Sequence, residues 1–234
     1  MKKILSLIIM LMFALSQAYA TDGILISAKD SAKEQRHVSD VGFRILNANG
    51  IPTRATFALV TSRKINAFCD LKYRSICIYR TMYERCETED ELAAILAHEI
   101  GHSVDSYNGA FRGIGTCIAM HYSPRKYEYK ADKRAVDYLV NAGYNPVAMI
   151  VVLSKNGPQG HYELFSTHPL TTKRMMEIYE YIYKKYPEYL VNNAYKENIY
   201  YQNFLLTSQS NRAKFQEKVK TNSNKKVHYL WLDF

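Results

Sequence analysis

The sequence predicts an α+β fold that is mostly helical and contains one small antiparallel sheet. Two observations support this: apolar residues recur at helical spacing in several segments, and three short β-prone stretches lie together in the first third of the chain. The chain has 234 residues, of which about 214 remain after the N-terminal leader described next. Because that length suits one domain with a substantial core, we expect a single domain.

The N-terminus has the pattern of a secretory signal peptide. Lys2 and Lys3 precede an apolar run over 4–15, and Ala18-Tyr19-Ala20 places small residues at the usual cleavage spacing. About a dozen apolar residues fall short of the roughly 20 that a helix needs to cross a bilayer, which disfavours the alternative of a membrane anchor. We therefore expect residues 1–20 to be removed, and the mature protein to be periplasmic or secreted without a transmembrane segment.

The charge of the mature chain limits its partners. Loss of Lys2 and Lys3 lowers the formal net charge from +9 to +7, and the other basic residues are spread along the chain rather than gathered in blocks. This distribution is typical of a solvated basic surface. Export argues against a nucleic-acid partner, and weak attraction to anionic envelope surfaces or acidic substrates is the functional alternative.

Four cysteines follow the leader: Cys69, Cys77, Cys86 and Cys117. An even number in an exported protein predicts two disulfides. The sequence leaves all three pairings open, although Cys86 and Cys117 flank a helix expected over 89–107. Buried free thiols are the alternative, and a cysteine zinc site is disfavoured because no Cys-x-x-Cys occurs.

A helix and the sheet are expected first after the leader. Val38, Val41 and Ile45 recur at helical spacing, and the repeat ends at Asn49-Gly50, where glycine suits the end of a helix. Three β-prone stretches with polar turns between them follow, over 56–61, 65–69 and 75–79. We expect these stretches to form the antiparallel sheet.

Two central helices are marked by their ends. Thr88 and Glu91 form a capping box, and a helical repeat then continues to Asn108-Gly109, which predicts a helix over 89–107. Ser123-Pro124 opens a second helix, because proline suits the first helical position, and Gly143 closes it.

The rest of the chain is expected to hold two more helices and a tail. Asn145-Pro146 opens one helix, and another, with an apolar stripe typical of a core face, is predicted over 171–186. We place the main domain at 21–206. Residues 207–234 form a polar, lysine-rich tail with an apolar end, predicted to be a closing strand or a docked terminal segment; a substrate exosite is the alternative.

The chemistry-bearing motif lies in the middle of the helix expected over 89–107. His98-Glu99-Ile100-Gly101-His102 places two imidazoles one turn apart on one helix face, where both can hold the same metal ion. Neutral imidazoles are good zinc ligands. Glu99 lies beside them, where a carboxylate can take a proton from an attacking water and pass it to a leaving amine.

A third ligand is predicted in the next helix. Glu128 completes a His₂Glu set that leaves one zinc position open, as a catalytic site requires. Asp132, one turn later, is placed to hydrogen-bond a liganding histidine. A solvated helix face among lysines is the alternative. We therefore expect one Zn²⁺ per chain, held by His98, His102 and Glu128.

Several segments together match the pattern of a known family. They are residues 65–68, 91–102, 128–132, 142–146 and 166–169, with Arg174 six residues after His168. These segments resemble the gluzincin zinc metallopeptidases of family M48, which include the CaaX prenyl protease. The resemblance implies a zincin-type fold with the sheet beside the active-site helix. It also implies that His168 and Arg174 line the active site, where they stabilise the oxyanion or, for His168, fill the open zinc position.

The expected function is zinc-dependent cleavage of polypeptides in the cell envelope or outside the cell. Substrates are expected to be unfolded or misassembled envelope proteins, bound as an extended strand beside 65–69. A chaperone-like module that only holds polypeptides is the main alternative, and the presence of Glu99 argues against it. A secreted effector peptidase is the second.

Overall fold

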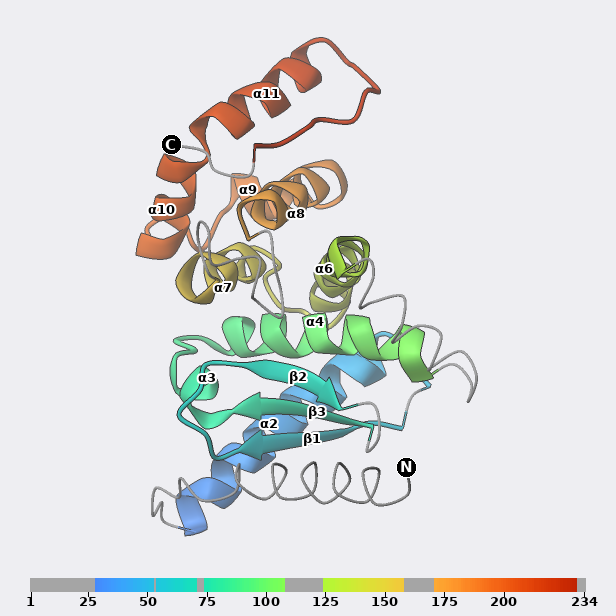
Figure 1. The fold of residues 1–234 in the computed structure, drawn as a ribbon, viewed down its shortest axis with the longest axis vertical. Helices are drawn as coiled ribbons and strands as arrows, with labels where there is room; N and C mark the ends of the chain where they lie inside the picture. Colours follow the sequence, from blue (N-terminus) through green and yellow to red (C-terminus); the bar gives the residue numbers. More distant parts are fainter. Residues whose placement is uncertain (1–27, 53, 71–73, 108–123, 158–170, 231–234) are drawn as a thin grey trace, which may run out of the picture.

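The computed structural model of the chain describes residues 28–52, 54–70, 74–107, 124–157 and 171–230 (Figure 1). These residues form a mostly helical structure with one small sheet, which confirms the predicted α+β class. Helix α4 (Glu89–Tyr107) lies in the middle, with the sheet on one side and α6 (Pro124–Asn141) and α7 (Ala148–Asn156) on the other. Helix α2 (Ala28–Ala48) packs against the sheet and α4.

The sheet is mixed, so the prediction of an antiparallel sheet is wrong for one of its two strand pairs. Strands β1 (Thr56–Val60), β2 (Ala67–Asp70) and β3 (Ser75–Tyr79) lie in the order β1-β3-β2. β2 pairs with β3 antiparallel, whereas β1 pairs with β3 parallel, with Thr56 opposite Ser75. The most apolar strand takes the centre: three consecutive residues of β3 are buried, while β2 has one.

Helix α4 is buried on all sides for most of its length. Every residue over 91–103 is buried, including Leu92, Leu96 and Ile100 at 1% exposure or less. A helix that is buried all round belongs in the centre of a domain. The polar side chains in this stretch are therefore held where little water reaches them.

The predicted helix ends are confirmed at both glycine caps. Gly50 has φ 56° after α2 and Gly143 has φ 78° after α6, a region that glycine enters at little cost. Helix α7 begins at Ala148, after Asn145 Oδ1 accepts a hydrogen bond from the Val147 N–H at 3.0 Å. Helix α8 (Thr171–Lys185) occupies the segment predicted over 171–186.

The C-terminal region is helical where the sequence predicts a polar tail. Beyond α9 (Glu188–Val191), α10 (Ile199–Thr207) and α11 (Gln209–Lys220) run along the far end of the molecule (Figure 1). Phe215 and Tyr229 are buried at 3% and 7% exposure. The last residues that the structure describes therefore pack against the domain through Tyr229. Among the described helices, none has the length and apolar character to cross a bilayer.

The prediction of two disulfides is not met by the described cysteines. Cys77 and Cys86 are free thiols, and neither is joined to Cys69. In the β2–β3 pair, Cys69 lies opposite Ile76 and Cys77 opposite Phe68, so the two cysteines point to opposite faces of the sheet. Strand geometry thus opposes a bond between them. Cys117 lies outside the described residues.

Candidate metal centre and active site

The start of α4 is fixed by hydrogen bonds that the sequence predicts. The Thr88 hydroxyl accepts the Glu91 N–H at 3.2 Å, and the Glu91 carboxylate accepts the Glu87 N–H at 3.2 Å. Lys155 of α7 donates to the same carboxylate at 3.2 Å. These bonds satisfy N–H groups at the helix start and set the direction of α4.

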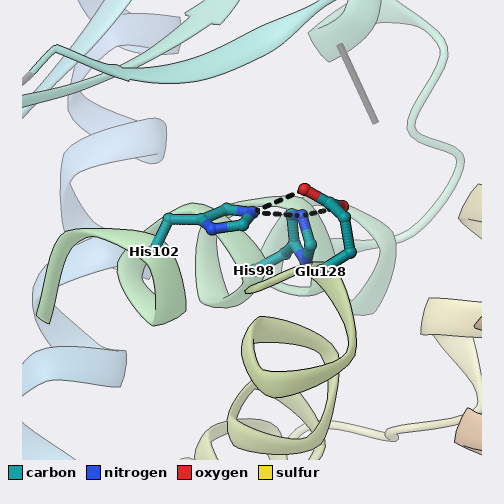
Figure 2. A group of neighbouring side chains, drawn as sticks. All are labelled: His98, His102 and Glu128. Atoms are coloured by element: carbon teal, nitrogen blue, oxygen red, sulfur yellow. Dashed lines mark hydrogen bonds and ion pairs between the residues drawn. The ribbon is translucent and has the colours of Figure 1, made fainter. Parts of the chain in front are cut away.

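Three potential metal ligands converge from α4 and α6 (Figure 2). His98 Nε2 and His102 Nε2 are 3.0 Å apart. Glu128 Oε2 lies 3.4 Å from His98 Nε2, and Glu128 Oε1 lies 3.2 Å from His102 Nε2. All three side chains are buried. Figure 2 shows both rings and the carboxylate directed toward one point.

The donor spacing fits a small tetrahedral ion. Ligand bonds of about 2.0–2.1 Å in a tetrahedron place donor atoms roughly 3.3 Å apart. The separations of 3.0 to 3.4 Å among His98, His102 and Glu128 agree with this value. The set of two imidazoles and one carboxylate also matches the ligands of catalytic zinc sites.

Close contact between α4 and α6 brings Glu128 to the histidines. Gly101, between the two histidines in sequence, faces the backbone of Ala131, and a Cβ on Gly101 would lie 3.0 Å from the Ala131 oxygen. Arg134 Nη1 donates to the Gly101 oxygen at 3.1 Å. The absence of a side chain at Gly101 therefore permits the approach that completes the cluster.

Two further charged residues, Arg174 and Asp132, contact two of the three potential ligands. Arg174 of α8 donates two hydrogen bonds of 2.7 Å to the two oxygens of Asp132, and Asp132 Oδ1 lies 2.9 Å from His98 Nδ1. Arg174 Nη1 lies 2.8 Å from Glu128 Oε2 in an ion pair outside hydrogen-bonding orientation. The guanidinium therefore bridges the carboxylates of Glu128 and Asp132, and it is 2% exposed.

The site is rich in buried charge. Glu99, Glu128 and Asp132 place three carboxyl groups here, all at most 4% exposed, and Arg174 adds a buried guanidinium. Burial alone would lower the pKa of His98, yet its contacts with Asp132 and Glu128 raise it to about 10. The neighbouring carboxylates therefore favour positive charge at this ring.

Asp132 remains ionised in this environment. Burial acts to raise its pKa, but the Arg174 charge and hydrogen bonds outweigh burial, so the pKa lies below its ordinary value. The ionised carboxylate lies 2.9 Å from His98 Nδ1, and Nε2 of that ring faces His102 and Glu128.

A cavity of about 190 Å³ opens beside His98 and Glu99. Its walls come from the residues before and at the start of β2, from α3 (Arg80–Glu84), from α4 and α8, and from α7. The walls are mainly apolar and include Ala94, Ile95, Met149, Val152, Leu153 and, as a polar member, Asn156. The cavity therefore adjoins the candidate metal centre and is large enough for a side chain.

The structure brings together most of the residues that the sequence singles out. His98, Glu99, His102, Glu128, Asp132 and Arg174 all lie in or behind the cluster. His168 lies outside the described residues.

Sequence reasoning missed the contribution of α7. Met149, Val152 and Asn156 line the cavity, but their apolar spacing reads as ordinary core and gives no local sign of a site. Asn156-Gly157 reads only as the start of a loop. Lys155, one residue earlier, also gives no sign in the sequence, because its burial to 4% exposure is visible only in the structure.

Comparison with known proteins agrees with this geometry. The chain is 24% identical over 183 residues to the Beta-barrel assembly-enhancing protease of Escherichia coli (strain K12), in an alignment that covers 61% of this chain and 37% of that protein. The protein of the same name from Yersinia pestis is 25% identical over the same coverage. This chain thus spans little more than a third of the length of these relatives. The model of peptidase family M48 matches residues 32–110 and 103–182, more than half of the chain, and the chain therefore belongs to that family.

Proposed function

We propose that this protein is a zinc metalloendopeptidase that cleaves polypeptides in the cell envelope. One observation carries the proposal: two imidazoles and one carboxylate converge in a buried site with the donor spacing of a tetrahedral zinc centre. When bound by His98, His102 and Glu128, zinc supplies Lewis acidity that polarises a carbonyl and makes water more acidic.

Glu99 is the proposed general base. The residue is 4% exposed and lines the cavity beside His98, so its carboxylate can serve both an attacking water and a substrate amide. It takes a proton from the water and delivers it to the leaving amine. Low exposure strengthens this function, because fewer solvent molecules compete for the carboxylate.

Arg174 is proposed to position the site rather than to bind an oxyanion. Its guanidinium is engaged by Asp132 and Glu128. These contacts hold Glu128 toward the histidines and keep Asp132 on His98 Nδ1. His168 remains a proposed oxyanion donor or gate on the strength of the family resemblance alone.

Substrate is proposed to bind as an extended strand along β2. The two edges of the described sheet differ. Along the β1 edge, Gln35 Nε2 donates to the Phe57 oxygen and the Leu59 N–H donates to Gln35 Oε1, both at 2.8 Å. This side chain thereby occupies the groups that a pairing strand would need. The other edge, β2, packs beside α4, and its preceding residues line the cavity. Strand addition at β2 would present a backbone carbonyl near the histidines.

The cellular setting is proposed from the N-terminal pattern and from the relatives. The leader predicts export to the periplasm or beyond, and the relatives' name refers to assembly of β-barrel proteins. We propose unfolded or misassembled envelope proteins as the substrates.

The test is hydrolysis by the zinc-loaded protein and by Glu99→Gln. Zinc content is measured by mass spectrometry and turnover with an unfolded, fluorescently labelled polypeptide. We expect one zinc per chain in both proteins and a loss of roughly 10²–10⁴-fold in turnover for the variant. Glu84→Gln, at an exposed glutamate, is the matched control and should keep full activity. Wild-type turnover in Glu99→Gln, or a zinc-loaded wild type that cleaves nothing, would contradict the proposal.

A further inference from the structure

The cavity beside Glu99 has a polar end whose orientation is fixed by Arg85. Arg85 Nε donates to Asn156 Oδ1 at 2.6 Å, and Arg85 Nη2 donates to the Lys155 oxygen at 3.2 Å. A guanidinium can only donate, so the oxygen of the Asn156 amide must face Arg85. The two hydrogens of Asn156 Nδ2 are therefore left for another acceptor.

The size of the cavity matches an aromatic ring. A dry apolar cavity of roughly 150 Å³ is sufficient to hold benzene. The cavity here measures about 190 Å³, and its walls include Ala94, Ile95, Met149, Val152 and Leu153. A phenyl ring fills most of that space, and the remainder can take one further small group.

The position of Glu99 fixes which substrate residue enters. Glu99 is itself a wall of the cavity. In the function proposed above, on which this step rests, Glu99 hands its proton to the amine that leaves, so it lies next to that nitrogen. The side chain attached to the leaving nitrogen belongs to the residue just after the scissile bond, and that side chain is the nearest to the cavity.

We propose that this cavity selects an aromatic residue immediately after the scissile bond, with tyrosine preferred over phenylalanine, and that Asn156 is the specificity-determining residue. The ring lies among the apolar walls, and the Asn156 amide donates to the tyrosine hydroxyl. Arg85 acts as a positioning residue, because it holds the amide with its donors toward the cavity.

The test uses peptides that differ only in the residue after the scissile bond: Tyr, Phe, Ala or Glu. Mass spectrometry of the products identifies the bond that is cut. For the zinc-loaded wild type we expect kcat/KM for Phe to exceed that for Ala by roughly 10- to 100-fold. Tyr should exceed Phe by about 3- to 10-fold, the value of one neutral hydrogen bond. Glu should be cleaved less well than Phe, because burying a charge among mainly apolar walls is costly.

Two variants separate the apolar walls from the polar end. Asn156→Leu should reduce the Tyr/Phe ratio to 1 or less while Phe is still cleaved. Val152→Phe should fill the cavity and reverse the preference toward Ala. Asn203→Leu, the same chemical change on the exposed face of α10, is the matched control and should leave all ratios unchanged. Dissociation constants of the same peptides for zinc-loaded Glu99→Gln give a readout that does not depend on turnover, and they should follow the same order.

The outcomes distinguish the two proposals. If wild type cleaves the peptides but treats Tyr, Phe and Ala alike, the specificity inference is overturned and the proposed function stands. If Tyr and Phe differ but Asn156→Leu keeps that difference, the role of Asn156 is overturned. If the zinc-loaded protein neither cleaves nor binds any peptide, the proposed function fails and this inference fails with it.

Discussion

Two charged clusters lie on different faces of α8, and they differ in how deeply they are buried. At the candidate metal centre, the side chains of Arg174, Asp132 and Glu128 are at most 5% exposed. At the C-terminal end, Glu180 accepts hydrogen bonds from Lys184, Lys218 and Tyr229, and the Lys184 side chain is 54% exposed. The second cluster joins α8 to α11 and to Tyr229. The comparison indicates that charges held away from water mark the candidate site, whereas a partly exposed cluster joins segments of the fold at little cost.

The largest effect is expected from removing a carboxylate of the buried cluster at the candidate metal centre. Glu128→Ala deletes a proposed zinc ligand, so metal affinity should fall by more than the roughly 10- to 100-fold typical of outer-shell changes, and hydrolysis should be lost. Glu180→Ala removes a carboxylate from the same helix bundle and should keep both metal and activity. Zinc titration with a competing chelator measures the affinity. A Glu128→Ala protein that binds zinc like wild type would remove this residue from the ligand set.

Arg174→Met tests whether the guanidinium stabilises the buried carboxylates beside it. It leaves the buried carboxylates of Asp132 and Glu128 without their cation, which should lower the free energy of unfolding of the zinc-free protein by about 3–5 kcal/mol. With zinc bound the loss should be smaller, since the divalent cation takes over part of that role. Urea denaturation with and without zinc measures both values. Equal losses in the two states would show that the arginine and the ion do not share the charge.

Gly101→Ala tests how closely the site depends on helix spacing. The added methyl would lie 3.0 Å from the Ala131 oxygen, so α4 and α6 must move apart. We expect a loss of about 1–3 kcal/mol in the free energy of unfolding and weaker zinc binding. Gly50→Ala is the control for a change with a strained backbone but no contact within 4 Å, and it should lower stability without altering zinc affinity. Zinc affinity that is unchanged in Gly101→Ala would contradict the importance of the close approach.

The smallest effect is expected from a change of pH at the cluster around Glu180. Burial acts to raise the pKa of Glu180, but hydrogen bonds from Lys184, Lys218 and Tyr229 lower it to about 2. A lowered folded-state pKa means that this carboxylate stabilises the fold above its unfolded pKa of 4.5, and that the contribution is lost as pH falls from 4.5 toward 2. The effect is local, because solvent screens the partly exposed lysines.

Limited proteolysis with an acid-active protease measures this pH effect. Cleavage within 221–230 should increase between pH 4.5 and 3, because the contact that holds Tyr229 weakens. Glu180→Gln should already be sensitive at pH 4.5 and should change little on further acidification. A C-terminal segment that is equally protected at both pH values in the wild type would contradict the assignment.

Local pattern was enough to predict the parts of the site that lie on one helix. The spacing of His98 and His102 sets them on one face of α4, and Glu128 and Asp132 are related in the same way on α6. Helix ends were predictable for the same reason, since Gly50 and Gly143 act within a few residues of the helices that they close. In the C-terminal region the periodicity was too weak. α10 docks through Tyr201 and Phe204, and α11 docks through Phe215, and no local repeat predicts these contacts.

The sequence by itself determined that two histidines and a carboxylate are placed to hold one ion, because the helical repeat fixes side-chain direction over a single turn. Only the tertiary structure decided how these helices meet: Arg174 reaches Asp132 across 42 residues of chain, and Arg85 orients Asn156 across 71. It also placed β3 in the centre of the sheet, since burial of the most apolar strand outweighs sequence order. Contacts of this kind depend on packing between distant segments, so a local sequence pattern does not predict them.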